Sequence, residues 1–507
     1  MAVKKKTPVK SKRAVSKKGS TKTAALEEVP VASALMFYSD VLDSQEQKAR
    51  LSSNSLRYLD PLSTGVLCLD RALGGGLYNT FASIAGPEAS GKTTSCYHAM
   101  STSIRTCSFT GLFDAEGTLN PDYASNVFRP FGIDFKSMMS TKPSPMRYYR
   151  NNVIEKVIDL IHGVLKMMPD KVWVDDLQSW GYVIPKNNKY FKSMMEARDM
   201  KPIKDFSTDT TFLCQAENSG IEGAFFIDSL AAMVTEEDDD HEQRSKRRAA
   251  EAASFSLNMK RIVSRLSSKG VSLFGVNQLR KIPGQTYGDP NYEPGGEAIK
   301  FYSAQRLRIA SRVPKDDTQV DREKETGHAI EASVQKKGGK DRYAYKFFKN
   351  TKNKITFPGH SGFVRVWISD AFGDVRGIDP FYDVLEYLGK TDQIIKYARE
   401  KKANGGGWLY KFNLLPTVGA KRAKLLNSCK PVNYMQLKAL ILGEVDKDVR
   451  LLKVFNNAAK IKEGVKVNLR DSLFNQIRTD PSVLKVNVNV KAKGDTEQED
   501  ESEVEEI

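Results

Sequence analysis

The chain has 507 residues, of which 40% are hydrophobic and 28% charged, and its formal net charge is +16. This composition is that of a globular protein with two or three domains. It excludes a membrane-spanning segment, because no apolar run is long enough to cross a bilayer, and a secretory signal, because no apolar stretch follows the first charges.

The charge indicates the kind of binding partner, and the cysteines indicate the redox compartment. A strong excess of cations favours a polyanionic partner, because cations that contact phosphates release condensed counterions. The five cysteines are scattered, and no pair has the spacing of a metal site. We therefore expect a reducing compartment rather than a disulfide framework.

Each end of the chain carries charge of one sign. Met1–Thr23 contains eight lysines and one arginine without an acid, whereas Gly494–Ile507 contains acids without a base. These segments predict a disordered basic arm over residues 1–25 and a disordered acidic tail over residues 486–507. The two ends either serve solubility alone, or the arm contacts nucleic acid while the tail competes with DNA for basic surface.

An α/β pattern follows a short N-terminal segment. Residues 26–61 are partly apolar with helical character, and we expect an oligomerisation segment there. Across residues 62–378, short apolar runs alternate with helical stretches, which predicts a mainly parallel twisted sheet with helices on both faces. The runs are Phe81–Ala85, Thr110–Phe113, Ala224–Ile227 and Val271–Val276.

Three further regions differ from this alternation. Asn152–Met168 has apolar residues at three- and four-residue spacing and predicts an amphipathic helix that stops before Pro169. Residues 171–222 are rich in Lys and Met without a clean period, and we expect an insertion there. From Asp379 the chain turns helical again, which predicts a smaller C-terminal α/β or helical domain over residues 379–485.

The sharpest motif is GPEASGKT at Gly86–Thr93, which follows an apolar strand and precedes a helical stretch. This is the Walker A pattern in the strand–loop–helix context that it requires. Glycines let backbone N–H groups approach phosphate oxygens, and the helix N-terminus adds its positive dipole end. We expect Lys92 to contact the β- and γ-phosphates of ATP and the Thr93 hydroxyl to ligate Mg²⁺. The predicted nucleotide-binding residues are Gly86, Pro87, Glu88, Ala89, Ser90, Gly91, Lys92, Thr93 and Thr94.

Such a site also needs a carboxylate near the metal and a group that activates water. Asp228 and Asp175 both follow apolar runs, and the pattern barely separates them. Asp228 is favoured because another apolar strand, ending at Gln278, follows at a helix-length distance. Glu116 closes the strand after the P-loop helix, at the sheet edge where ligands of parallel sheets collect. It is the predicted general base, with a solvated loop carboxylate as the alternative.

The order of the motifs from Ser63 onwards resembles that of the RecA family. Ser63–Gly76 runs into the Walker A motif, and about six matching segments cover residues 62–411 apart from the insertion. The resemblance implies a RecA-like P-loop ATPase core. The insertion and tails suggest a divergent member, of the kind that phages encode in the UvsX group, although the motifs are closer to bacterial RecA. The later segments are Asp114–Ala124, Phe226–Ala232, Val276–Arg280, Pro294–Ala304, Lys352–Gly359 and Arg376–Gly389.

The resemblance also implies roles around the bound nucleotide. Asp228 takes the position of the Walker B carboxylate, which with Thr93 holds Mg²⁺. Glu116 takes that of the catalytic base, and Tyr123 that of an aromatic that stacks on adenine. Gln278 corresponds to the glutamine that senses the γ-phosphate and couples it to the DNA loop that follows.

Three further residues resemble those that join neighbouring subunits of the family. Lys352 and Lys354 match two lysines that reach the ATP of the adjacent subunit, so hydrolysis would depend on assembly. Phe301 matches an aromatic at the subunit interface.

The segment after Gln278 is the predicted DNA loop. Its basic groups suit the DNA backbone, and glycine N–H groups approach phosphates closely, although an ordinary surface loop has a similar composition. Thr235–Arg248 lies where the family has its first DNA loop, but its residues do not match and no roles carry over. Leu415–Ala423 resembles half of a helix–hairpin–helix, with a plain basic helix start favoured over it. The predicted DNA-binding residues are Arg280, Lys281, Gln285, Tyr287, Gly295 and Gly296.

Together these features predict an ATP- and Mg²⁺-dependent recombinase. It would form a helical filament on single-stranded DNA and pair that strand with homologous duplex, in the cytoplasm of a bacterial or phage-infected cell. Hydrolysis through Glu116, completed by lysines of the next subunit, would loosen the filament. Two alternatives stay open: a hexameric motor or helicase on the same core, and a structural DNA-binding protein that binds nucleotide without hydrolysing it.

Overall fold

The computed structural model of the protein divides into two compact units, Met1–Ser52 and Ser53–Ile507, and every described residue belongs to the second. The predicted basic arm, acidic tail and nearly all of the oligomerisation segment therefore lie outside the described residues. The described residues are 59–142, 144–187, 189–204, 207–236, 244–281, 291–310, 342–369, 377–399, 408–433, 436–437, 440–441 and 469–479.

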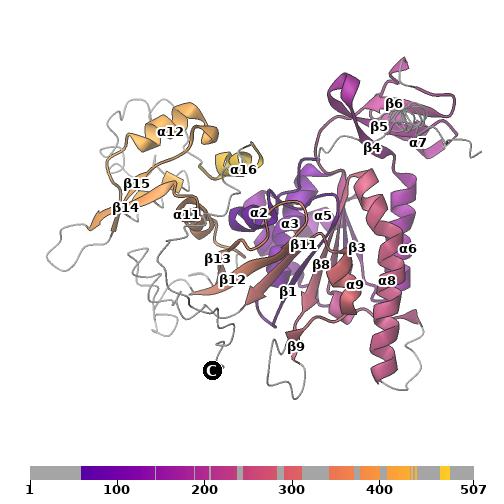
Figure 1. Ribbon diagram of the computed structural model, residues 1–507, viewed down its shortest axis with the longest axis horizontal. Helices are drawn as coiled ribbons and strands as arrows, with labels where there is room; N and C mark the ends of the chain where they lie inside the picture. The colour runs from indigo at the N-terminus through magenta and orange to yellow at the C-terminus, as the bar shows by residue number, and fades with distance from the viewer. Residues whose placement is uncertain are drawn as a thin grey trace, which may run out of the picture. The chain divides into compact units, whose positions relative to one another are not determined.

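An eight-stranded sheet forms the centre of the second unit, in the order β13-β12-β11-β1-β8-β7-β2-β3 (Figure 1). Neighbours from β11 to β3 are parallel, and β12 and β13 continue the sheet antiparallel. The mainly parallel sheet expected from the alternating apolar runs is thus confirmed. The strands are β1 (Phe81–Gly86), β2 (Phe109–Asp114), β3 (Met146–Tyr149), β7 (Gly223–Asp228), β8 (Val271–Gln278), β11 (Gln305–Ala310), β12 (Arg342–Asn353) and β13 (Ser361–Ser369).

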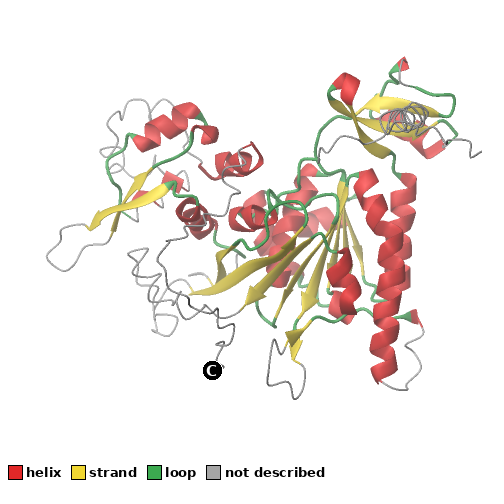
Figure 2. Cartoon of the chain, viewed as in Figure 1, coloured by secondary structure: helices red, strands yellow, loops and turns green. Residues whose placement is uncertain are grey.

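Helices pack on both faces of the sheet (Figure 2). Alternate strand residues enter two separate hydrophobic clusters: Phe226 packs with α2, α3, α4 and α11, whereas Phe225 and Ile227 pack with α6, α8 and α9. This alternation is what a strand buried on both faces requires. The helices are α2 (Leu67–Leu73), α3 (Lys92–Thr106), α4 (Pro121–Phe128), α5 (Phe135–Ser140), α6 (Ile154–Met167), α8 (Arg244–Lys269), α9 (Gly296–Tyr302) and α11 (Pro380–Lys390).

The amphipathic helix predicted over Asn152–Met168 is confirmed as α6, whose buried residues include Ile154, Ile158 and Ile161. None of the described helices is both long and apolar enough to cross a membrane.

The inserted segment folds as a small antiparallel sheet with one helix. Its strands are β4 (Asp170–Val174), β5 (Ser179–Pro185) and β6 (Thr211–Gln215), with α7 (Lys189–Ala197) between the last two. At its base, the buried Lys171 ammonium lies 2.7 Å from Glu222 Oε1 and donates to the Gly220 carbonyl at 2.8 Å. This ion pair joins the first and last residues of the insertion.

The region after α11 combines strands and helices. β14 (Ile394–Arg399) and β15 (Trp408–Phe412) form an antiparallel pair, followed by the 3₁₀ turn η8 (Pro416–Val418), α12 (Ala420–Asn427) and α16 (Leu469–Thr479). The region after Asp379 therefore contains both helices (α11, α12 and α16) and a strand pair, which is the α/β form of the two that the sequence left open.

Candidate nucleotide-binding site

The register of the central strands brings four distant segments to one edge of the sheet. Gly86 at the end of β1 lies opposite Gln278 at the end of β8. Asp228 at the end of β7 lies opposite Val276 on one side and Asp114 of β2 on the other. Ligands of parallel sheets bind at this carboxyl edge, so the predicted residues converge where a nucleotide is expected.

The loop between β1 and α3 has the backbone of a phosphate-binding loop. Ala89 and Gly91 adopt left-handed conformations, with φ of 53° and 91°, and α3 begins directly after Gly91. The Lys92 side chain is folded back into the loop, where its Nζ donates to the Pro87 carbonyl at 2.5 Å and to Ser90 Oγ at 3.4 Å. Burial lowers the pKa of Lys92, while Asp228 opposes this shift. An oxyanion placed in the loop would compete for the same ammonium.

Asp228 and Thr93 form the oxygen pair of the site. The Thr93 hydroxyl donates to the Asp228 carboxylate, and burial raises the pKa of Asp228 to about 6 despite this hydrogen bond. Hydroxyl and carboxylate oxygens are the ligands that Mg²⁺ prefers, usually one or two from the protein with the rest from phosphates and water. The two residues therefore fit a Mg²⁺ ion that arrives with a nucleotide. Among the described residues there is no cluster of three or more candidate metal ligands.

Glu116 receives two hydrogen bonds from residues that are distant in sequence, one at the end of β8 and one directly after β7. Ser229 Oγ donates to Glu116 Oε1 at 2.5 Å, and Gln278 Nε2 donates to the same oxygen at 2.8 Å. These bonds fix the exposed carboxylate at the same edge as the P-loop. A carboxylate held in this way can orient and deprotonate a water molecule.

The loop that carries Glu116 is shaped by Asp114, which is buried. Its Oδ1 accepts the backbone N–H groups of Gly117 and Thr118 at 2.8 and 3.2 Å, and its Oδ2 accepts that of Leu119 and the hydroxyl of Tyr148 at 3.0 and 2.9 Å. Asp114 thus holds the backbone of this loop in place. Glu116, two residues later, is exposed at the site.

Tyr123 lies beside the P-loop helix. Its hydroxyl is hydrogen-bonded to Thr94 Oγ1, and its ring centroid is 5.9 Å from that of Tyr97. Tyr123 therefore lies against the first turns of α3. Asp175, the alternative to Asp228, lies in the 3₁₀ turn between β4 and β5 of the insertion, where its Oδ1 accepts from Trp173 Nε1.

Lys352, Lys354 and Phe301 lie away from the P-loop, beside the first half of β1. In the strand register Lys352 lies opposite Arg306, which lies opposite Ser83, three residues before Gly86. The Lys354 N–H donates to the Ala304 carbonyl. The Lys354 ammonium is 5.7 Å from the centroid of the Phe301 ring, whose residue is 68% exposed. The structure therefore does not bring these residues to the nucleotide site of their own chain.

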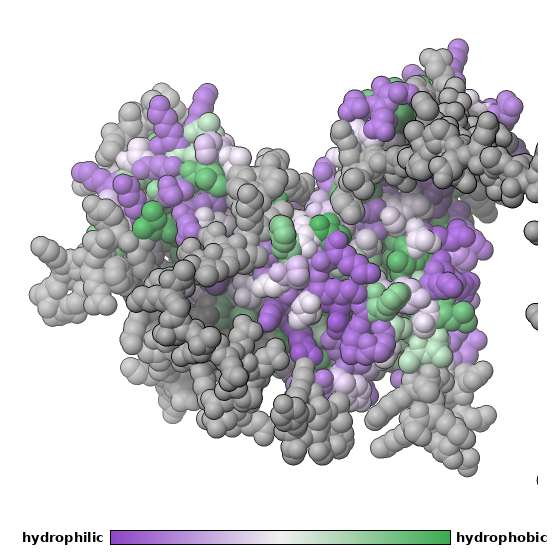
Figure 3. Space-filling model, in the orientation of Figure 1, coloured by the Kyte–Doolittle hydropathy of each residue, from purple (hydrophilic) through white to green (hydrophobic). Residues whose placement is uncertain are grey.

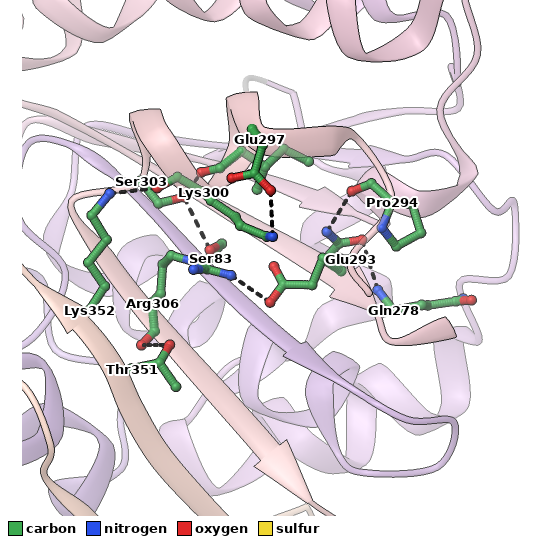
Figure 4. A network of polar contacts seen from close by, with 12 residues as sticks. Ser83, Gln278, Glu293, Pro294, Glu297, Lys300, Ser303, Arg306, Thr351 and Lys352 are labelled. Atoms are coloured by element: carbon green, nitrogen blue, oxygen red, sulfur yellow. Dashed lines mark hydrogen bonds and ion pairs between the residues drawn. The ribbon is translucent and has the colours of Figure 1, made fainter. Parts of the chain in front are cut away.

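A polar network runs from Gln278 toward these residues (Figure 4). Asn277 Oδ1 accepts the Gln278 N–H at 2.9 Å, and Asn277 Nδ2 donates to the Pro294 carbonyl at 3.0 Å. Next to Pro294, Glu293 pairs with Arg306 at 2.5 Å.

At the far end of the network, Lys352 Nζ donates to the carbonyls of Lys300 and Phe301 at 2.5 and 3.1 Å. These carbonyls belong to the last turn of α9, where a cation is favourable. Figure 3 shows hydrophilic side chains grouped over the middle of the view, where Figure 1 draws β11 and β8.

The predicted DNA-binding residues are described only in part. Arg280 and Lys281 form β9 (Arg280–Lys281), which pairs with β10 (Asn291–Tyr292), and Arg280 is exposed. Gln285 and Tyr287 lie outside the described residues, as does the middle half of Thr235–Arg248, residues 237–243. Gly295 and Gly296 have φ of 87° and 68°, and a Cβ at Gly296 would lie 2.8 Å from Ala252 Cβ, so both serve the tight start of α9.

Several residues of the site were not singled out from the sequence. Ser229 and Asn277 each adjoin a predicted residue within a quoted motif, so adjacency to Asp228 and Gln278 was a usable signal. Their roles depend on which strands lie side by side. Lys346, on β12 beside the P-loop, had no sequence signal at all.

The chain is similar in sequence to known proteins over much of its length. The family model for the RecA N-terminal domain matches residues 44–159 and 214–358, slightly more than half of the chain, and the gap falls largely within the insertion. RecA proteins of Nostoc sp. (strain PCC 7120) and Synechococcus elongatus are 25% and 26% identical over 261 residues, which are 51% of this chain and 55% of each relative. The chain thus spans about half the length of these relatives. RecA of Streptococcus sanguinis is 24% identical over 410 residues, 79% of either chain.

Proposed function

Because the chain belongs to the RecA family, we propose that it is a DNA-dependent ATPase that forms filaments on single-stranded DNA and promotes pairing with a homologous duplex. Bound Mg²⁺ would neutralise phosphate charge and polarise the γ-phosphate. The chain's own residues would hold the nucleotide, orient the attacking water and sense the γ-phosphate. A net charge of +16 supports a nucleic-acid partner.

The observation that carries the proposal is the shared hydrogen bonding of Glu116 with Gln278. Gln278 Nε2 donates to the Glu116 carboxylate at 2.8 Å, and Gln278 leads directly into β9 and the predicted DNA loop. A γ-phosphate would compete with Glu116 for the amide of Gln278. Movement of this amide would free Glu116 to activate water and would shift the strand that leads to the loop.

Nucleotide and DNA would therefore act on each other through one side chain. ATP would favour the DNA-binding form of the loop, and DNA would favour the hydrolytic position of Glu116. Coupling of two binding sites is reciprocal by thermodynamic necessity.

The first prediction concerns Lys92→Ala. Loss of the ammonium removes the charge that binds the β- and γ-phosphates, so we expect no DNA-stimulated hydrolysis. The measurement is phosphate release by the full chain with and without single-stranded DNA, beside negative-stain imaging. Lys390→Ala, at an exposed position on α11, is the matched control and should turn over ATP like the unaltered chain.

The same experiment separates the proposal from its alternatives. Turnover that ignores DNA, or that persists in Lys92→Ala, would contradict the proposal. Closed rings in the images would favour a hexameric motor. Nucleotide binding without any turnover would favour a structural nucleotide-dependent protein.

A further inference from the structure

Strand β12 is long and carries lysines toward both of its ends. The register with β11 shows how far along the sheet each lysine lies. Lys352 lies opposite Arg306, and Lys349 lies opposite Arg308. Phe347 lies opposite Ala310, the last residue of β11. On the other side of β11, Arg308 is level with Ala85, one residue before the P-loop begins. Lys346 precedes Phe347 in the chain. Because β12 runs antiparallel to β11, Lys346 lies one position further toward the P-loop and is level with the loop itself.

The face of the sheet on which Lys346 lies is fixed by its partner on β13. Lys346 is opposite Val364, and directly opposed residues of an antiparallel pair project to the same side. Val364 belongs to the hydrophobic cluster that includes Cys96 and Ala99 of α3. The Lys346 side chain is therefore on the face covered by the P-loop helix.

The side chain of Lys346 reaches the loop. A Cβ placed on Gly91 would lie 3.8 Å from Lys346 Cγ, so the aliphatic part of this lysine packs against the glycine that precedes Lys92. Its charge is also felt at Lys92, where it contributes to the lowered pKa, after burial as the main cause.

Lys346 is half-buried, and none of the residues that the structure describes supplies an anion to it. Burial lowers its own pKa, and among the described residues no carboxylate or other acceptor pairs with its ammonium. A cation withdrawn from water without a counter-charge is unfavourable. Such a residue beside a second lysine is stabilised when a polyanion enters between them.

We propose that Lys346 is a second phosphate-binding lysine, which contacts a non-transferred phosphate of the nucleotide bound to its own subunit. The strand order β12-β11-β1-β8-β7-β2 places Lys346 on one flank of the P-loop and Glu116, Ser229 and Gln278 on the other. Because Glu116 marks the γ-phosphate side, the flank of Lys346 faces the phosphates that ATP and ADP share. This inference rests on the proposed nucleotide site, and it makes β12 a link between a subunit's own nucleotide and the one that Lys352 and Lys354 would reach.

The test is nucleotide binding by the full chain without DNA. Charge-assisted hydrogen bonds are roughly twice as strong as neutral ones, so we expect Lys346→Met to weaken ATP and ADP binding alike, each by about tenfold. Uniform weakening changes KM and leaves kcat unchanged. Lys346→Arg should retain most of the affinity. Lys349→Met, three residues along the same strand and exposed, is the matched control and should bind normally.

Each result decides the question. Unchanged affinity in Lys346→Met would overturn the inference, as would weaker binding of ATP alone, which would place the lysine at the γ-phosphate. Because removal of an unpaired, half-buried charge should not destabilise the apo protein, a lower melting temperature for Lys346→Met would mean a structural role. Lys92→Ala in the same assay tests the site itself: if it too binds normally, the proposed nucleotide site fails, and not only Lys346.

Discussion

At the scale of single residues, the site combines charged groups whose burial is unfavourable until a ligand arrives. Burial raises the pKa of Asp228 from a usual value of 3.8 to about 6. In the folded chain this carboxyl therefore holds a proton at pH values where the unfolded chain has released it. Its contribution to the free energy of unfolding falls as pH rises through this window and stays low at neutral pH.

Asp228→Asn should accordingly separate stability from activity. The amide removes the buried charge, so the free energy of unfolding of the apo protein at pH 7 should rise by about 2 kcal/mol. Hydrolysis should be lost because the metal loses a carboxylate ligand. Chemical denaturation at pH 7 and pH 5 checks this, and the gain should shrink at pH 5.

The same carboxyl sets an expectation for the unaltered chain. Hydrolysis should decline as pH falls through about 6, and a higher Mg²⁺ concentration should move this decline to lower pH, because the metal competes with the proton. A decline that ignores Mg²⁺ would count against Asp228 as its origin.

At the scale of elements, hydrogen bonds between side chains and backbone N–H groups join helices α2 and α3 to α11 and the residues just before it. Asp383, fully buried on α11, accepts the N–H groups of Leu67 and Cys68 at 2.8 and 3.0 Å and so caps the start of α2. His98 on α3 accepts the Ile378 N–H at 2.9 Å. Two helices near the P-loop are thus held by residues about 300 positions later in the chain.

Asp383→Ala tests this connection. Two buried N–H groups would lose their acceptor, and we expect the free energy of unfolding to fall by about 2 kcal/mol. Equilibrium denaturation measures it, with Lys390→Ala on the same helix as the control. Equal stability of the two variants would show that α2 does not depend on this cap.

At the scale of the whole molecule, the protomer separates the two halves of the proposed catalytic machinery. Lys92 and Glu116 lie at the carboxyl edge of the sheet, whereas Lys352 and Lys354 lie beside the first half of β1, with the exposed Phe301 next to Lys354. A surface and a site that are complementary but lie apart on one chain assemble head to tail. This arrangement supports a filament in which each subunit completes the next.

Mixing two inactive variants tests assembly directly. Glu116→Gln should bind ATP without hydrolysing it, and Lys352→Ala should lack the lysine supplied to the neighbour. In an equal mixture, about a quarter of the interfaces pair an intact Glu116 with an intact Lys352, as expected for random head-to-tail assembly. DNA-stimulated hydrolysis should therefore return to about a quarter of the normal rate. No recovery would mean that Lys352 acts within its own chain.

The sequence by itself determined the parts of this protein that are contiguous. The Walker A loop, the apolar strands and α6 are each built from one short segment, and local backbone geometry and apolar periodicity specify them. The order of motifs was sufficient to identify the family. Asp228 was nearly tied with Asp175 on pattern alone, because each directly follows a short apolar run.

Only the tertiary structure decided which segments meet. Ser229 and Gln278 reach Glu116 across 113 and 162 residues, Asp383 caps a helix more than 300 residues earlier, and Lys346 arrives at the P-loop through the register of β12. Such contacts depend on strand order and on residue-by-residue pairing between strands. Neither leaves a local pattern in the chain, because backbone hydrogen bonds between strands do not depend on which side chains the paired residues carry.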